Sequence, residues 1–216
     1  MEQDSLQQIR NNHLADILCA QRTKGDGSLA ELTECTDGGL TTVKKCVFQA
    51  MDFGMIVAGD IGASTGGRKA QRYILNKDYQ YFLFLIVDNN ALLCCVYDFK
   101  YNLCEKYSVH FQMENYMNSV CKVIDQTIEK YNLGTICLSV PCIMKDGIIL
   151  DWYYNRQMEG VNIRKTLEEK YHLNVIVQND MKLTVVGESA KHRQNVKDIV
   201  TVQFGHNGIR EWKCTP

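Results

Sequence analysis

Apolar residues recur at three- and four-residue spacing in the first fifty positions, and this spacing predicts helices. A first helix is expected from Asp4 to about Ala20, followed by a polar connection. Ser28 with Glu31 forms a capping box that starts a second helix. After a turn at residues 37–39, the third helix has an apolar stripe of Leu40, Val43, Val47 and Met51.

A hairpin is predicted after the third helix. Gly54 is expected to end that helix, because glycine favours the left-handed cap position. A strand then begins near Met55, and the return strand is Gln71–Leu75. The loop between them carries Gly66, Gly67, Arg68 and Lys69. Three helices and a hairpin with a basic tip predict a winged helix-turn-helix over residues 1–75, whose expected partner is double-stranded DNA.

Four polar side chains lie off the apolar stripe, near the start of the third helix: Thr41, Thr42, Lys44 and Lys45. In a helix-turn-helix this position faces the major groove, where hydroxyls and lysines contact base edges and phosphates. Arg68 and Lys69 of the wing are expected to reach the DNA backbone or the minor groove. The alternatives are a merely solvated helix face, and a capping role for Thr42.

The segment from Asp60 to Ser64 permits a second interpretation. It is similar to the DxGxT/S phosphate loop of sugar kinases with the actin-like ATPase fold, in which backbone amides face phosphate. Here a helix-turn-helix precedes the segment and Gly-Gly-Arg-Lys follows it. This context favours the wing over the phosphate loop.

From Tyr79 onward the pattern becomes one of strands, and then of alternating helices and strands. The expected strands are 81–87, 91–97, 103–111, 135–140, 147–150, 174–177 and 198–204. Helices are expected after residue 112, after the cap Asn162, and from about Asp180 to Ala190. This order predicts that residues 76–216 form an α/β domain, specifically one ribonuclease-H-like lobe of the actin-like ATPase fold.

Composition limits the function classes. The chain has 216 residues, 45% hydrophobic and 23% charged, which is typical of a globular protein. No apolar run is long enough for a bilayer and no signal peptide is present, so a cytoplasmic protein is expected. The formal charge of -1 means that DNA contacts must come from local clusters, namely residues 44–45 and Arg68, Lys69 and Arg72. Ten cysteines without a CxxC pair predict free thiols, and neither metal nor cofactor is expected.

The chain resembles the ROK family of bacterial repressors and sugar kinases, and within it the repressors. The resemblance lies in the wing segment 64–69 and in the order of Val140-Pro141, Asp151-Trp152, Leu167, residues 177–180 and Gly187-Glu188. It implies a sugar or sugar-phosphate effector bound by Asn179 and Asp180, since the matching aspartate is the general base in family kinases. The alternative for Asp180 is that it caps the following helix. For Trp152, Tyr153 and Tyr154 core packing is expected, and stacking on a sugar ring is the alternative.

Two departures from the family bear on activity. The turn at Asp88–Leu92 lacks the glycines of the kinase phosphate loop, and the chain stops at Pro216, where the family's second lobe would begin. The sequence therefore predicts a truncated, non-enzymatic regulator of carbohydrate-use genes, homodimeric and with weak or no effector binding. The alternative is a sugar kinase that phosphorylates a hexose or N-acetylhexosamine with ATP.

Overall fold

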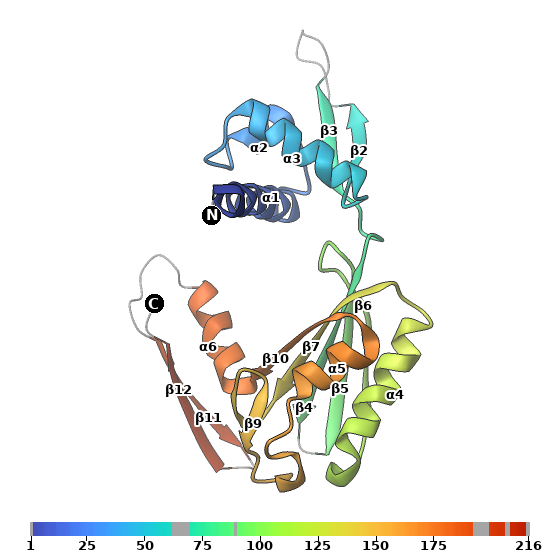
Figure 1. Cartoon of the computed structure of the whole chain (residues 1–216), viewed down its shortest axis with the longest axis vertical. Helices are drawn as coiled ribbons and strands as arrows, with labels where there is room; N and C mark the ends of the chain where they lie inside the picture. Colours follow the sequence, from blue (N-terminus) through green and yellow to red (C-terminus); the bar gives the residue numbers. More distant parts are fainter. Residues whose placement is uncertain (1, 62–69, 89, 192–198, 206–207, 215–216) are drawn as a thin grey trace. The chain divides into compact units, whose positions relative to one another are not determined.

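The structure is a computed structural model that describes residues 2–61, 70–88, 90–191, 199–205 and 208–214 (Figure 1). Side chains are described for residues 12–60, 70–88 and 90–189. The chain divides into two compact units, residues 1–80 with 98–102 and residues 81–97 with 103–216. The segment 98–102 was expected in the second domain, but it belongs to the first unit.

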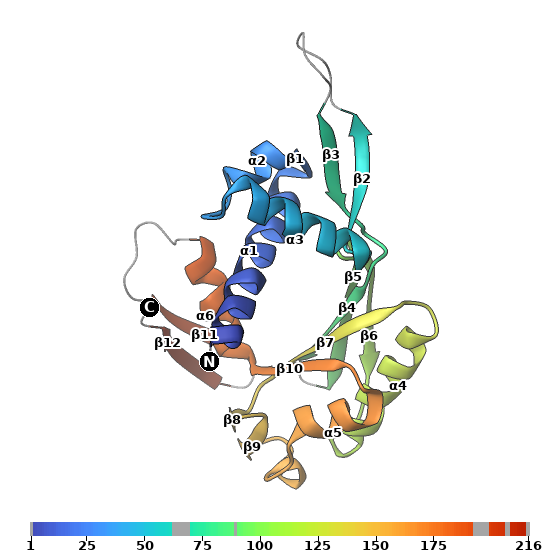
Figure 2. The same cartoon turned by 45° about the horizontal axis from the view of Figure 1, so that its top comes forward.

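The first unit consists of three helices and a small antiparallel sheet. Its elements are α1 (Glu2–Lys24), β1 (Asp26–Ser28), α2 (Leu29–Thr33), α3 (Leu40–Asp52), β2 (Ile56–Ile61) and β3 (Gln71–Leu75). The strand order is β1-β3-β2. Helices α1 and α3 pack against each other (Figure 2). The core between helices and sheet is apolar and includes Ile17, Leu32, Val43, Val47, Ile56 and Leu75.

Local signals place the start of α2 and the end of α3 correctly. The Ser28 hydroxyl accepts from the amide of Glu31, and the Glu31 carboxylate accepts from the amide of Ser28 at 2.7 Å. At the end of α3, Gly54 has φ +78°, and the amides of Gly54 and Met55 donate to the carbonyls of Met51 and Ala50. This is a Schellman motif, in which a glycine in the left-handed region ends the helix.

Some details of the first unit differ from the predictions. Helix α1, expected to end near Ala20, continues to Lys24. Asp26 and Gly27, expected in the polar connection after it, belong to β1, which pairs with β3 from Asp26↔Ile74 to Ser28↔Arg72. Leu40, expected on the buried stripe of α3, is 54% exposed. It is the first residue of the helix, and the burial of a residue at a helix end depends on the neighbouring elements rather than on the helical period.

The second unit contains a mixed five-stranded sheet with helices. Its elements are β4 (Tyr81–Asp88), β5 (Ala91–Tyr97), β6 (Leu103–His110), η1 (Met113–Asn115), α4 (Tyr116–Ile128), β7 (Leu133–Val140), β8 (Ile143–Lys145), β9 (Ile148–Asp151), η2 (Arg156–Met158), α5 (Ile163–Tyr171), β10 (Asn174–Asn179), α6 (Asp180–Lys191), β11 (Ile199–Gly205) and β12 (Gly208–Cys214). The hairpins β8–β9 and β11–β12 form two further small sheets. Strands β8 and β12 were not expected.

The large sheet has the order β10-β7-β4-β5-β6. Strands β4, β7 and β10 are mutually parallel, whereas β5 is antiparallel to both of its neighbours. The predicted α/β class is therefore confirmed, and the mixed sheet is consistent with an actin-like lobe. Because β4, β7 and β10 are parallel, their carboxyl ends meet at one edge of the sheet, where ligands bind in many open α/β sheets.

One face of the sheet forms the core of this unit. Alternate residues of β4, Leu83, Leu85 and Val87, are buried in it together with Val120 and Ile124 of α4. Helix α5 lies beside α4, and the two are joined by a hydrogen bond from the Tyr171 hydroxyl to the Asp125 carboxylate at 2.8 Å. Helix α5 also begins as predicted, since the Asn162 side chain accepts from the amide of Lys165 at 3.0 Å. None of the helices in the described residues is both long and apolar enough to cross a bilayer.

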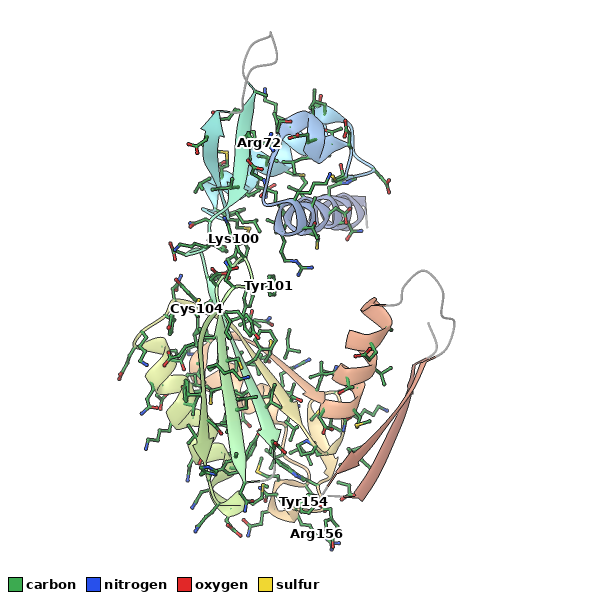
Figure 3. All side chains as sticks on the ribbon, turned by 180° about the vertical axis from the view of Figure 1, so that it is seen from behind. Arg72, Lys100, Tyr101, Cys104, Tyr154 and Arg156 are labelled. Atoms are coloured by element: carbon green, nitrogen blue, oxygen red, sulfur yellow. The ribbon has the colours of Figure 1, made fainter. Side chains whose placement is uncertain are left out.

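The segment 98–102, between β5 and β6, is a tight turn. The buried Asp98 carboxylate accepts from the amides of Lys100 and Asn102, at 2.8 Å and 2.9 Å. Tyr101, labelled in Figure 3, has φ +64°, and the Arg22 guanidinium lies 4.8 Å from the centre of its ring. The Phe99 ring contacts Tyr79. These contacts explain why the segment belongs to the first unit.

Candidate functional site

The first candidate site is the solvent-facing side of α3. Its N-cap is Gly39, which has no side chain to bond the first turn, so Thr42 is not the cap of this helix. Thr41, Lys44 and Lys45 are exposed and Thr42 is half-buried. The buried stripe on the opposite side is Val43, Cys46, Val47 and Ala50. Of the four residues singled out by the sequence, three thus project from one surface and Thr42 lies at its margin.

An aromatic residue adjoins these polar side chains. Phe48 follows Lys44 by one helical turn, and the Lys44 ammonium lies 5.5 Å from the centre of the Phe48 ring. The ring also lies near the buried Tyr73 of β3, at 6.4 Å between centroids. The sequence analysis did not select Phe48. The sequence feature that could have identified Phe48 is its position off the apolar stripe, four residues after Lys44.

Three basic residues of the hairpin were expected to contact DNA, and the structure describes one of them. Arg68 and Lys69 lie outside the described residues. Arg72, labelled in Figure 3, is already paired with two carboxylates. Its guanidinium donates to the Asp26 carboxylate at 3.0 Å and forms an ion pair with Glu31 at 3.2 Å. Hydrogen bonding to Arg72 lowers the pKa of Asp26, while the amide and hydroxyl of Ser28 lower that of Glu31. Arg72 therefore joins β3 to β1 and α2, and the expected DNA contact by this residue is not supported.

The second candidate site is at the carboxyl end of β10. The Asn179 side chain donates to the carbonyl of Cys142 at 2.7 Å and accepts from the amide of Lys182 at 3.1 Å. The second bond caps α6, so the capping role considered for Asp180 belongs to Asn179. Asp180 is the first residue of α6, and its carboxylate accepts from the amide of Met181 at 2.9 Å.

A surface cavity of about 380 Å³ adjoins Asn179. It is lined by Pro141, Cys142, Ile143, Asp151, Tyr153, Tyr154 and Asn179. Asp180 is close to it rather than in its lining. Burial, followed by the charges of Asp180 and Asp151, raises the pKa of Cys142 to about 12, so that its thiol stays protonated at neutral pH. The cavity therefore offers hydrogen-bonding carboxylate, hydroxyl and amide groups but no thiolate nucleophile.

The aromatic residues after β9 have two different roles. Trp152 is fully buried and packs edge-on against Tyr116 at 4.9 Å, so the expectation of core packing holds for it. It does not hold for the next two residues, because Tyr153 is 74% exposed and Tyr154 is 44% exposed. Both rings border the cavity, with Tyr154 labelled in Figure 3. Exposed tyrosines beside a cavity that also holds a carboxylate are suited to stacking on a sugar ring.

Metal-binding groups, thiols and the β4–β5 turn bear on what chemistry the rest of the chain can perform. Among the described residues, no three His, Cys, Asp or Glu side chains are placed to hold a metal ion. The cysteines with described side chains are free thiols, and burial raises the pKa of Cys94 and Cys137 to about 11. In the turn between β4 and β5, Asp88 pairs with Ala91, while Asn89 lies outside the described residues.

Comparison with known proteins identifies the family. The sequence model of the ROK family matches residues 89–209, more than half of the 216-residue chain. The chain belongs to the ROK family. The resemblance to the ROK family inferred from the sequence is thereby confirmed. No curated protein sequence matches the chain.

Solved ROK structures share its fold. A ROK family transcriptional regulator, described as a homologue of the E. coli MLC protein, has a TM-score of 0.75 at 15% identity, over 96% of this chain and 55% of that one. A putative N-acetylmannosamine kinase from Listeria monocytogenes gives 0.54 at 18%, over 61% and 46%. A ROK glucokinase from Streptomyces griseus, solved with glucose and AMPPNP, gives 0.51 at 15%, over 61% and 43%. The chain thus spans about half the length of these proteins, and at these identities the likeness concerns the fold.

Proposed function

We propose that this chain is a DNA-binding transcriptional regulator of the ROK type, a repressor of carbohydrate-use genes. In this proposal residues 1–75 form a winged helix-turn-helix in which α2 and α3 are the helix pair and α3 is the recognition helix. The observation that carries it is the exposed face of α3, where Thr41, Lys44 and Lys45 project together. Side chains at the start of a recognition helix contact base edges and phosphates in the major groove.

The extent of the structural likeness supports the same function. The likeness to the ROK transcriptional regulator covers 96% of the chain and so includes both units. The likeness to the two kinases covers 61%. A regulator uses both units of the chain, whereas a kinase would leave the face of α3 without a role.

The proposed effector is a sugar or sugar phosphate bound beside Asn179. The cavity there provides the Asp151 carboxylate and two exposed tyrosines, with Asp180 nearby. Its lining comes from the segment after β7, from β8 and β9, from the loop after β9 and from the end of β10, and its polar side chains are Asp151, Tyr153, Tyr154 and Asn179. With so few polar partners, a sugar in this cavity would make only part of its possible hydrogen bonds. At about 1 kcal/mol net for each bond, losing several lowers the affinity by orders of magnitude. We expect weak binding or none by this chain alone.

A sugar kinase remains the second candidate, because Asp180 stands at the end of β10 next to this cavity, where a general base for a sugar hydroxyl would be needed. Phosphoryl transfer also requires a close approach of the backbone to the nucleotide phosphates. The sequence of the β4–β5 turn lacks the glycines for that approach. We therefore propose that the chain is not an enzyme, and that it acts as a homodimer, since one short helix reads few bases.

The experiment that tests this function is a salt-dependent DNA titration of the full 216-residue chain. Replacing Lys44 and Lys45 with alanine should lower the slope of log affinity against log salt by about two units, since each phosphate contact contributes about 0.9. Lys106→Ala with Lys122→Ala is the matched control, because both lysines are exposed in the second unit. The proposal fails if the unaltered chain shows no salt-sensitive binding to any genomic fragment, or if both double variants weaken binding equally.

A further inference from the structure

An exposed aromatic ring interrupts the polar face of α3. Phe48 is 43% exposed, whereas the buried residues of this helix lie on the opposite side. Thr41, Lys44, Lys45 and Phe48 are spaced i, i+3, i+4 and i+7, so they share one face over two helical turns. Single exposed apolar side chains are common on protein surfaces, so the meaning of Phe48 comes from its place on this face and from the residues that orient its ring.

The ring is held in place from two directions. Tyr73, buried in β3, supports it from the sheet at 6.4 Å, and the Lys44 ammonium lies 5.5 Å from its centre. Aromatic and cation–π contacts of this kind favour particular orientations of the ring. Phe48 is therefore presented to solvent in a defined orientation, next to a cation that can bind phosphate or a base edge.

Duplex DNA displays one apolar group in the major groove, the C5 methyl of thymine, and phenylalanine is among the side chains that contact it. Homeodomains read the major groove with four helix positions that have this same i, i+3, i+4, i+7 spacing. Three of the four positions on α3 carry hydroxyl or ammonium groups suited to phosphates and base edges. The fourth position carries Phe48, whose apolar ring is suited to contact with a methyl group.

We propose that Phe48 is a specificity-determining residue that reads the C5 methyl of a thymine in the bound DNA. This inference rests on the proposed function, because it takes the face of α3 as the DNA-binding surface. It adds a position at which the protein distinguishes T·A from the other base pairs, whereas lysine contacts to phosphate carry no sequence information.

The test replaces thymidine with deoxyuridine, which removes the methyl group and keeps the base pair. The probe is the tightest duplex that the 216-residue chain selects from a random 30-base-pair library, resynthesised with one deoxyuridine at a time. At one thymine in each half-site, the unaltered chain should lose about fourfold in affinity, which corresponds to about 0.8 kcal/mol for burying one methyl-sized group. Phe48→Ala should bind the thymidine and deoxyuridine duplexes equally at that position.

Phe48→Gln is the second variant, because it keeps a long side chain at an exposed helical position if Phe48→Ala proves unstable. It should show the same loss of discrimination, while Thr41→Ser, which removes only the threonine methyl, should retain it. The inference is overturned if no deoxyuridine weakens binding of the unaltered chain, or if both Phe48 variants still discriminate. DNA binding without discrimination refutes the role of Phe48 alone, whereas the absence of any selected duplex refutes the proposed function as well.

Discussion

The two helices that carry the candidate residues, α3 and α6, begin in different ways. The N-cap of α3 is Gly39, which provides no side-chain bond, and Thr41, Lys44 and Lys45 project into solvent. The start of α6 is held by Asn179, whose side chain bonds both Lys182 and Cys142. Substitutions on the exposed face of α3 should therefore change the affinity for a partner molecule. Substitutions of Asn179 should first change the stability of the fold.

The largest expected effect is on stability at the α6 start. Asn179→Ala should lower the free energy of unfolding by about 2 kcal/mol, since it removes a helix cap and the bond to the Cys142 carbonyl, each worth about 1 kcal/mol. Urea denaturation measures this difference. Asn179→Asp retains the acceptor for the Lys182 amide and should lose about half as much.

Asp180→Asn is the matched variant for sugar binding, because it removes a charge and leaves the Asn179 cap in place. It should change stability less than Asn179→Ala does. Micromolar sugar binding by the unaltered chain in calorimetry, abolished by Asp180→Asn, would show that the cavity beside Asn179 suffices for the effector. If Asn179→Ala is as stable as the unaltered chain, the capping role is wrong and Asn179 is free to act as a ligand-binding residue.

A smaller effect on stability is expected at the start of α2, where the capping box includes the Glu31 carboxylate. The pKa of Glu31 is lowered by Ser28 and that of Asp26 by Arg72. A lowered pKa in the folded state means that this stabilisation is complete above the usual carboxyl range, near pH 4, and is lost as the pH falls through the folded-state value. Urea midpoints at pH 7 and pH 3 should differ less for Glu31→Gln than for the unaltered chain. Equal differences would show that the capping box contributes nothing to acid sensitivity.

The smallest effect is expected at Gly39. A Cβ there would meet no atom within 4 Å, and the residue already has extended backbone angles. Gly39→Ser should therefore supply a cap and stabilise the protein by a few tenths of a kcal/mol in thermal unfolding. Gly39→Asp should stabilise it similarly but weaken DNA binding, since it adds a negative charge beside Lys44 and Lys45. Unchanged DNA affinity in Gly39→Asp would place the start of α3 away from the DNA.

Much of the fold could be predicted because its signals are local. The capping box at Ser28, the Asn162 cap and the stop at Gly54 each depend on residues within one helical turn. The bounds of β3 and β5 also agree with the sequence pattern. For the candidate site, the same patterns showed that Lys44 and Lys45 lie off the buried stripe of α3.

Other features depend on distant partners and were decided by the tertiary structure. Strand β1 has three residues and exists because β3 lies beside it, more than forty positions later in the chain. The Arg72 guanidinium could be counted as a DNA contact until Asp26 and Glu31 were seen to pair with it. Neutralisation by a neighbouring carboxylate leaves no pattern in the sequence around an arginine.

Periodicity and the order of motifs were enough to predict the family, the α/β class and the surface of α3 that faces away from the core. The packing of the folded chain was needed to see that Asn179 rather than Asp180 caps α6. It was also needed to see that Phe48 stays exposed beside Tyr73, while Trp152 is buried against Tyr116. The physical reason is that helical and strand periods fix the direction of a side chain. Its burial and its hydrogen-bond partners depend on the elements that fold against it.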